Sequence, residues 1–381
     1  MFLPYARQTI DQNDIDSLSQ VLTSDWITRG EKTAEFEEAV ARYVGAKYAV
    51  AFNSGTSALH ASAFAVNLNP QDRFLTTPNS FIASSACGIA RGAIPRFIDI
   101  DRKTGSLDLS LVEKNINQPI SRGKTVFLPV HFAGIPFDVQ KISQILKDPG
   151  AVIIEDAAHA FGSQYKDGQM VGSCAFSDLT VFSFHPAKTI TTGEGGMVTT
   201  NDPNLYERLK LFRNNGIERK VDIPWEYDIK ETTGNFHLTD FQAALGLSQL
   251  KRVDEFISKR RIAASHYRKL LSDFPHLEMF SPELDEKTAH HLFVVQIDFD
   301  ALGTSREVVM RALLEKGVGT QLHYIPLYRH SAIENISGDI SDYFPEMERY
   351  YSRTLSLPLY PLLELKEIER VVKNLRETVG I

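Results

Sequence analysis

Short apolar segments alternate with helical patterns over the first half of this chain, and this alternation constrains the fold more than any other feature. Six such segments predict strands at 48–52, 94–98, 125–131, 151–154, 179–184 and 196–200. Helices are expected from about Ala58 and over 81–91. Apolar strands separated by helices are typical of a mostly parallel sheet that is buried on both faces. The sequence therefore predicts an α/β fold.

The pattern changes after residue 240. Apolar residues at spacings of three and four predict one long helix over 240–271. Beyond it, 292–297 and 319–323 are expected to be strands, and 346–352 and 365–379 to be helices. We expect two domains, namely residues 1–250 with the N-terminal segment and a large ligand-binding domain, and residues 251–381 with a small α+β domain.

Charge and composition narrow the class of partner. The 381-residue chain has a formal net charge of −7, which argues against nucleic-acid binding because that function needs a basic face. No segment approaches the roughly 20 apolar residues needed to cross a bilayer, and the first residues do not resemble a secretory signal. Cys87 and Cys174 are too far apart in sequence to form a local metal pair. A cytoplasmic setting without membrane contact or metal is expected.

Polar residues that follow strand ends are candidates for a binding site, because ligands bind beyond the carboxyl ends of the strands in parallel sheets. Residues 53–58 (NSGTSA) follow the first strand and lead into a helix. The first N–H groups of a helix are unpaired and lie at the positive end of its dipole. The segment therefore predicts a phosphate cradle, although an ordinary helix N-cap would use the same residue types.

Asp156 and Lys188 follow two other expected strands. Asp156 could pair with a protonated ring nitrogen, and a turn aspartate is the alternative. Lys188 lies five residues beyond Ser183 and just before a glycine-rich segment, 193–196. A lone lysine is usually a surface residue. In a buried setting, however, the pKa of the amine would fall, and only the neutral amine is a nucleophile.

The order of these features favours one cofactor. A phosphate cradle, a carboxylate and an amine are partners for the phosphate, the ring nitrogen and the aldehyde of pyridoxal 5′-phosphate (PLP). His159, three residues after Asp156, could hydrogen-bond the ring hydroxyl. Phe81 could stack on the ring, although a core position suits it equally well. The sequence thus predicts a PLP enzyme in which Lys188 holds the cofactor as a Schiff base.

Four segments resemble a known family. They are FNSGTSAL (52–59), EDAAHAFGS (155–163), SFHPAKTITTGEGGMVTTND (183–202) and GNFHLTDFQAALGLSQL (234–250). They resemble the DegT/DnrJ/StrS family of nucleotide-sugar aminotransferases, and the resemblance extends over nearly the whole chain. It implies fold type I of the PLP-dependent transferases, as in aspartate aminotransferase, and a homodimer with shared active sites.

The resemblance also implies roles for individual residues. Lys188 and Asp156 match catalytic positions. The cofactor-binding residues that it implies are Gly55, Thr56, Ser57, Phe81, Asp156, His159, Ser183, Lys188 and Asn235, of which Asn235 comes from the other subunit. The substrate-binding residues that it implies are Tyr5, Asp25, Trp26, Ile27, Thr28, His323, Tyr324, Ile325 and Pro326.

The chain departs from the family pattern at His237, where an arginine is usual. An arginine offers a phosphate a permanent charge and a planar fork of donors, and a histidine cannot offer both. If this position helps to hold substrate, the affinity or its pH dependence is expected to differ.

Within the family, SFHPAKTITT and HYIPLYRH (323–330) are similar to the branch that acts in pseudaminic acid biosynthesis. This similarity implies transfer of an amino group from glutamate to the C4 keto group of a UDP-linked 4-keto-6-deoxy-N-acetylhexosamine. The product would be UDP-4-amino-4,6-dideoxy-N-acetyl-β-L-altrosamine. Keto sugars linked to dTDP or GDP, and amination at C3, stay open. Some relatives are dehydratases with histidine at the lysine position, so Lys188 favours transamination.

Two rival functions agree less well with the sequence. A nicotinamide oxidoreductase would carry G-x-G-x-x-G at a strand-to-helix turn, and no such motif occurs, since Gly193, Gly195 and Gly196 lack the third spacing. A non-catalytic regulator with a PLP fold would not need an intact lysine, aspartate and phosphate cradle. Transamination with ping-pong kinetics is therefore the prediction.

Overall fold

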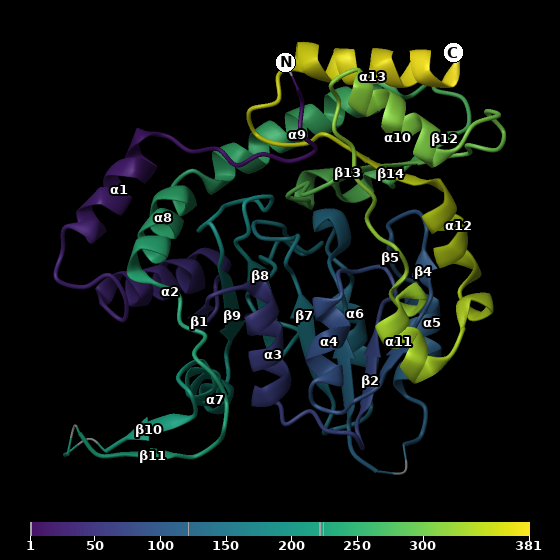
Figure 1. The fold of residues 1–381 in the computed structure, drawn as a ribbon. Helices are drawn as coiled ribbons and strands as arrows, with labels where there is room; N and C mark the ends of the chain where they lie inside the picture. The colour runs from purple at the N-terminus through teal and green to yellow at the C-terminus, as the bar shows by residue number, and fades with distance from the viewer. Residues whose placement is uncertain (1, 121, 221, 224) are drawn as a thin grey trace.

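The computed structural model describes residues 2–120, 122–220, 222–223 and 225–381. At its centre is a seven-stranded sheet in the order β1-β9-β8-β7-β6-β2-β3 (Figure 1). The strands are β1 (Tyr48–Phe52), β2 (Arg73–Thr76), β3 (Pro95–Phe97), β6 (Thr125–Leu128), β7 (Val152–Asp156), β8 (Leu179–Ser183) and β9 (Gly196–Thr200). Strand β9 runs antiparallel to β1 and β8, and the other neighbouring strands are parallel. The predicted α/β fold with a mostly parallel sheet is confirmed, and all six predicted strands belong to this sheet.

Strand β2 has no counterpart among the predicted strands. It begins at Arg73, whose charge hides this four-residue strand from a hydropathy pattern. The side chain is nevertheless buried, because its guanidinium donates hydrogen bonds to the carbonyl oxygens of Ile116 and Gln118 and to the hydroxyl of Thr125. Burial of this arginine is thus a consequence of partners that lie far away in the sequence.

Helices cover both faces of the sheet, as the two hydrophobic cores show. Val181 and Phe182 are consecutive in β8 and point to opposite faces. Val181 packs in a core with α3 (Gly55–Ala65) and α4 (Ala83–Ile89), whereas Phe182 packs in another with α2 (Glu31–Val44) and α8 (Asp240–Leu250). The other helices of this part of the chain are α1 (Gln12–Leu22), α5 (Leu109–Ile116), α6 (Val139–Ile145) and α7 (Pro203–Arg213).

The C-terminal part forms a smaller α+β unit. Its antiparallel sheet contains β12 (Leu277–Met279), β13 (Phe293–Ile297) and β14 (Thr354–Leu357). Its helices are α9 (Val253–Leu270), α10 (Arg306–Glu315), α11 (Ser331–Ser337), α12 (Pro345–Arg353) and α13 (Leu365–Val379). The N-terminus also contributes, because Leu3 lies in the core of this unit and its N–H donates to the carbonyl of Gly317 at 2.9 Å. The domain boundary at residue 250 stays a prediction.

Two predicted elements are wrong. Residues 319–323 do not form a strand, because Gly319 pairs with Leu3 while Gln321 forms an isolated bridge with Ser356, so no continuous ladder develops. The helix predicted over 240–271 is two helices, α8 and α9, separated at Lys251 and Arg252. The Arg252 guanidinium forms ion pairs with two aspartates of the α1 region, which lies against α8. This docking of α1 depends on contacts across the fold.

Two short ribbons complete the secondary structure. Strands β4 (Ile100–Asp101) and β5 (Ser106–Leu107) pair with each other, and β10 (Ile217–Arg219) pairs with β11 (Tyr227–Ile229). The β10–β11 ribbon projects away from the body of the molecule beyond α7 (Figure 1). In the part of the chain that the structure describes, none of the helices is both long and apolar enough to cross a bilayer.

Candidate active site

A cleft of about 410 Å³ opens at the carboxyl ends of β1, β7 and β8. We call it the sheet-edge cleft. Its volume lies in the range of pockets that bind small molecules. Ten of the predicted site residues line it: Tyr5, Gly55, Thr56, Phe81, Asp156, His159, Ser183, Lys188, His323 and Tyr324. Residues separated by more than 300 positions in the sequence thus meet in one cleft.

The first wall of the cleft is the N-terminus of α3. Ser54 caps this helix, and its Oγ accepts a hydrogen bond of 3.1 Å from the N–H of Ser57. The helix therefore begins at Gly55, three residues earlier than the sequence predicts. A Cβ at Gly55 would lie 2.8 Å from the Cβ of Ser183, so only glycine allows the end of β8 to approach this closely. Backbone N–H groups, the helix dipole and hydroxyls converge there, which suits a phosphate.

Asp156 forms the floor of the cleft at the last position of β7. Its Oδ2 accepts a hydrogen bond of 2.6 Å from the hydroxyl of Ser84, and its Oδ1 accepts one of 3.1 Å from the N–H of Ala158. Ser84 is held in turn by Ser80, 2.7 Å away. The carboxylate is buried and has a fixed orientation, so it can present an acceptor to a ring N–H in the cleft.

Lys188 lies in the loop that follows β8. Burial lowers the pKa of its amine from 10.5 to about 8, and the negative charge of Asp156 opposes this shift. A pKa near 8 means that a useful fraction of the amine is neutral close to physiological pH. Lys188 can therefore act both as a nucleophile and as a base.

Three histidines and a tyrosine surround the amine. His159 Nε2 lies 3.1 Å from the hydroxyl of Tyr324, and the ring of His291 lies 4.3 Å from that of His159, centroid to centroid. Burial first, and the charge of Lys188 second, hold the pKa of His159 well below its ordinary range and lower that of His323 to about 3. The pKa of His291 is also held well below its ordinary range, chiefly by burial. These rings are uncharged near neutral pH and serve as hydrogen-bonding groups.

The residues present fit PLP. Glycine at position 55 lets Ser183 approach the helix N-terminus, where the N–H groups and hydroxyls suit a phosphate. Asp156 offers a carboxylate, and Lys188 offers an amine. In addition, Nδ1 of His159 and Nδ1 of His291 are buried without a hydrogen-bond partner among the described residues. Buried polar atoms without partners are uncommon, and a polar ligand in the cleft is the kind of group that could supply one.

Several residues of the site carry no sequence signal that distinguishes them. Ser84, which orients Asp156, is one of many serines, and His291 lies 103 positions from Lys188 in the sequence. Arg260 is buried in α9 and donates to the carbonyl of Lys188 at 3.5 Å. The adjacent pair His290-His291, which directly precedes a predicted strand, is the one feature of the sequence that could have indicated His291 as a site residue.

Other predicted residues lie outside the sheet-edge cleft. Residues 25–28 are exposed, and Trp26 has 67% of its surface accessible. They run beside the start of α8, where Asp240 N–H donates to the carbonyl of Ile27 at 3.0 Å. Asn235 is exposed too, and it bridges to Asn214.

The remaining predicted residues lie at or near the mouth of the cleft. Ile325 lines a neighbouring pocket of about 620 Å³, which shares Phe81, His323 and Tyr324 with the cleft, whereas the buried Pro326 does not line it. Phe81 is 59% exposed at this rim, which excludes the core position considered for it.

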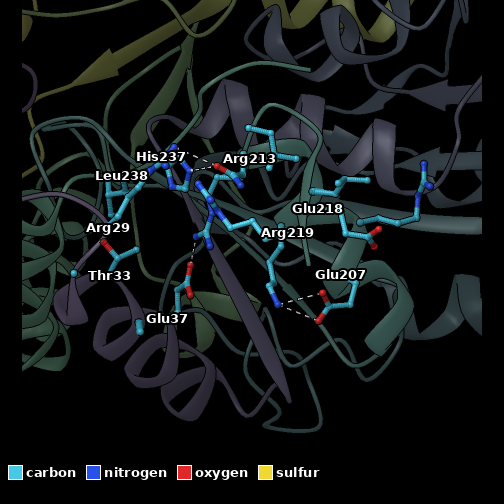
Figure 2. Close-up of a pocket in the computed structure, with 16 residues that line it drawn as sticks. Arg29, Thr33, Glu37, Glu207, Arg213, Glu218, Arg219, His237 and Leu238 are labelled. Carbon is cyan, nitrogen blue, oxygen red and sulfur yellow. Dashed lines mark hydrogen bonds and ion pairs between the residues drawn. The ribbon is translucent and has the colours of Figure 1, made fainter. Parts of the chain in front are cut away.

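A second pocket, of about 570 Å³, contains His237 (Figure 2). We call it the arginine pocket, because Arg29, Arg208, Arg213 and Arg219 line it together with Lys210. It is larger than the sheet-edge cleft, but the described residues that line it do not pair a buried lysine with a strand-end carboxylate. The sheet-edge cleft is therefore the candidate active site.

His237 and Arg29 share a partner in the arginine pocket. His237 Nε2 and Arg29 Nη2 each lie 3.2 Å from Oδ1 of Asn214. Burial lowers the pKa of His237 to about 4, and the charges of Arg213 and Arg29 add to this shift. His237 is thus neutral at pH 7. Arg213 forms an ion pair with Glu37, whereas among the described residues no carboxylate lies within ion-pairing distance of Arg29.

Comparison with known proteins agrees with this site. The model of the DegT/DnrJ/EryC1/StrS aminotransferase family matches residues 8–376, and the chain belongs to this family. It is a PLP-dependent sugar aminotransferase with the α/β fold of such enzymes.

Two relatives are similar to the chain over nearly its full length. The chain is 35% identical over 376 residues to UDP-4-amino-4,6-dideoxy-N-acetyl-β-L-altrosamine transaminase of Campylobacter jejuni, covering 98% of this chain and 96% of the relative. It is also 35% identical over 385 residues to the spore coat polysaccharide biosynthesis protein SpsC of Bacillus subtilis, covering 99% and 97%. The chain is thus equally similar to a transaminase that is named for its product and to a protein of spore coat polysaccharide biosynthesis.

Solved structures are similar over the full length. The structure of Helicobacter pylori PseC, an aminotransferase of pseudaminic acid biosynthesis, superposes with a TM-score of 0.91 at 31% identity and covers 100% of both chains. The PLP form of the sugar aminotransferase Spr1654 from Streptococcus pneumoniae superposes with a TM-score of 0.89 at 26% identity, covering 100% of this chain and 99% of that one.

Proposed function

We propose that this protein transfers an amino group from glutamate to the C4 keto group of a UDP-linked 4-keto-6-deoxy-N-acetylhexosamine. The product would be UDP-4-amino-4,6-dideoxy-N-acetyl-β-L-altrosamine. The observation that carries the reaction type is the Lys188 amine, which has a pKa lowered to about 8 in a cleft with a carboxylate and a phosphate cradle. The identity of the sugar is supported by the full-length similarity to the Campylobacter jejuni transaminase.

The residues of the sheet-edge cleft would hold the cofactor at both ends. Gly55, Thr56 and Ser183 would bind its phosphate, with Ser57 completing the helix N-terminus. Asp156 would accept a hydrogen bond from the ring nitrogen, and His159 would contact the ring hydroxyl. Phe81, at the rim, would cover one face of the ring. Bound PLP supplies an aldehyde that takes up the amino group and a ring that withdraws electrons from the adjacent carbon.

Lys188 would have two tasks. Without substrate, its Nζ would hold the cofactor as a Schiff base. When glutamate takes that place, the free Nζ would remove the proton from the carbon that bears the amino group and deliver it to the neighbouring acceptor carbon. Both tasks require a neutral amine, which the lowered pKa provides. The carboxylate of Asp156, whose orientation is fixed by Ser84 and Ala158, would hold the ring nitrogen by a hydrogen bond.

A homodimer with shared sites would complete the cleft. Among the described residues that line the cleft, Lys188 is the one lysine or arginine. A UDP-linked substrate carries two phosphates, and the arginine pocket has five cationic side chains against three glutamates. Asn235, two residues from His237, would reach the cofactor phosphate in the other subunit. Arg29 and Arg213 would then approach the phosphates of the substrate there. The exposed residues 25–28 directly precede Arg29, which lines this pocket, and would contact the sugar nucleotide.

A panel of nucleotide keto sugars tests the proposed function. Purified protein with PLP and glutamate is incubated with 4-keto sugars linked to UDP, dTDP or GDP, and the position of the new amine is determined by NMR. We expect glutamate-dependent amination at C4 of the UDP sugar, with the fastest turnover in the panel. Faster turnover of a dTDP or GDP sugar, or amination at C3, would replace the proposed substrate while keeping the enzyme class. No turnover with any of them would favour a non-catalytic role.

A further inference from the structure

The Lys188 amine has a partner that the proposed roles do not use. Its Nζ lies 3.5 Å from Nε2 of His291, a residue just before β13. This contact is long for a hydrogen bond, and catalytic hydrogen bonds often tighten only in the reacting complex. It joins two residues that approach the cleft from different parts of the fold, one from the large sheet and one from the C-terminal unit.

His291 is poorly satisfied by the rest of the protein. Its ring is buried, and Nδ1 has no hydrogen-bond partner among the described residues. A buried histidine that served packing alone would be expected to have partners for both nitrogens. The ring is uncharged near neutral pH, because burial holds its pKa well below the ordinary range. Nε2 can therefore accept a hydrogen bond from an amine.

Arg260 of α9 fixes the backbone of both residues. Its side chain is fully buried, and its guanidinium donates to the carbonyl oxygens of Lys188 at 3.5 Å, His291 at 3.4 Å and Leu359 at 3.0 Å. Among the described residues, no carboxylate lies within ion-pairing distance of it. Burying a cation without an ion pair is unfavourable. The carbonyl contacts offset part of this cost, and they link the backbone of Lys188 to that of His291.

We propose that His291 is a positioning residue for Lys188, with Nε2 accepting a hydrogen bond from the free amine and Arg260 anchoring both backbones. The accepted hydrogen bond leaves the lone pair of the amine free to point into the cleft. Such orientation matters in the proton-transfer step, because rates depend steeply on the geometry of the base. This inference rests on the proposed role of Lys188.

The pKa of the free amine reports on this contact. The cleft around this amine also contains other titratable groups, which are Asp156 at the end of β7, His159 in the next turn, Tyr5, His185, Glu194, His291, His323 and Tyr324. Asp156 raises the pKa of Lys188, and burial lowers it. A neutral acceptor such as Nε2 stabilises the ammonium form, so its removal should lower the pKa further.

The test uses the holoenzyme after conversion with glutamate, in which the amine of Lys188 is free. The pH dependence of Lys188 acetylation by acetic anhydride, followed by peptide mass spectrometry, gives its pKa. We expect a midpoint near 8 in the wild type and a value lower by at least about half a unit in His291→Leu. The spectral change with glutamate should slow by about 10-fold or more at little changed KM for glutamate. His291→Gln, which keeps an acceptor, should restore the pKa and the rate.

His290→Asn is the matched control, because His290 contacts the carbonyl of Asp285 instead of the cleft. It should leave the Lys188 pKa unchanged. An unchanged pKa in His291→Leu overturns the inference whatever the rate, and so does an equal shift in the glutamine variant or in the control. A further experiment tests the proposed role of Lys188 separately from that of His291. Borohydride reduction of the wild type, followed by peptide mapping, identifies the residue that holds the cofactor. Attachment at any residue other than Lys188 would refute the proposed role of Lys188.

Discussion

At the scale of single residues, burial changes the protonation of the Lys188 amine. The same burial that lowers the pKa of its amine to about 8 also opposes folding, because the charged form is destabilised in the native cleft. An unfolded chain carries this lysine with a pKa near 10.4. The native state therefore binds fewer protons than the unfolded state between about pH 8 and 10.4, and stability rises with pH across that window.

Lys188→Met should accordingly stabilise the protein when the cofactor has been removed. We expect a gain in the free energy of unfolding of about 2 to 3 kcal/mol at pH 7, which falls below about 1 kcal/mol at pH 10. Urea denaturation at the two pH values measures it. Lys366→Met, at an exposed lysine, is the control and should change little. A gain that does not depend on pH would show that the charge of Lys188 is not the cause.

Arg29 belongs to the same scale. It contacts the neutral Asn214 amide, and among the described residues no carboxylate lies within ion-pairing distance of it, so its charge remains available for an anion. His237, on the same amide oxygen, is neutral at pH 7 because burial lowers its pKa to about 4. The permanent charge that His237 lacks is thus present next to it.

Arg29→Met is expected to raise the KM for the nucleotide sugar about 10-fold with little change in kcat, because it removes binding that is equal in the ground and transition states. His237→Arg should lower that KM, since it adds a second planar donor fork. Steady-state kinetics at fixed glutamate measures both. Arg311→Met, on the exposed face of α10, is the control. The same KM in Arg29→Met and in the wild type would remove Arg29 from the proposed substrate site.

At the scale of elements, the junction between β8 and α3 determines whether the phosphate cradle exists. Ser54 caps α3, and Gly55 allows Ser183 to approach the first turn of the helix. By themselves, the residue types at 53–58 favour an ordinary helix cap over a phosphate cradle. The structure shows that the two interpretations are compatible, since the capping side chain belongs to Ser54 and leaves Gly55 and Thr56 facing the cleft.

Gly55→Ala should therefore weaken cofactor binding without unfolding the chain. The added Cβ would lie 2.8 Å from the Cβ of Ser183, so helix and strand must move apart. We expect the Kd for PLP to rise by about 10-fold or more, with a loss of stability of about 1 to 3 kcal/mol. Absorbance titration with PLP measures the former. Gly150→Ala, where a Cβ meets no atom closer than 3.5 Å, is the control. Equal PLP affinity in both variants would contradict a tight cradle.

At the scale of the whole molecule, the two pockets divide the proposed site between them. The sheet-edge cleft has the lysine and the carboxylate, and the arginine pocket has most of the positive charge. None of the described residues lines both pockets. A single subunit therefore separates the chemistry from the cations that a UDP-linked substrate would need, and a homodimer would bring them together.

Complementation between two inactive variants tests this arrangement. Lys188→Ala and Asn235→Ala should each be inactive or nearly so as homodimers. Coexpression should restore about a quarter of the wild-type activity, because half of the dimers would be mixed and one of the two sites in each would be intact. The activity of the unfractionated dimers measures it, and mixed dimers purified with two different tags should have about half of the wild-type activity per dimer. No restoration in purified mixed dimers would place Asn235 in the same site as the Lys188 of its own chain.

The sequence by itself determined the local features. Alternating apolar segments predicted six strands of the mostly parallel sheet, and the order of the 53–58 segment, Asp156 and Lys188 predicted three groups that meet in the sheet-edge cleft. These features are carried by neighbouring residues, since strand propensity, capping and strand-end position depend on a few positions each. Strand β2 was not predicted, because its first residue, Arg73, is charged. This side chain can be buried only because it donates hydrogen bonds to carbonyl oxygens that are distant in the sequence.

Only the tertiary structure decided which distant residues meet. His291 reaches Lys188 from 103 positions away, Arg260 holds both from α9, and Ser84 orients Asp156 across 72 positions. It also separated the arginine pocket from the cleft, and it placed Arg29 and His237 on one amide oxygen. The physical reason is that burial and charge are properties of a neighbourhood in space. A lysine amine acquires a pKa of about 8 from all the chain segments packed around it, and the pattern of residues next to it cannot contain that information.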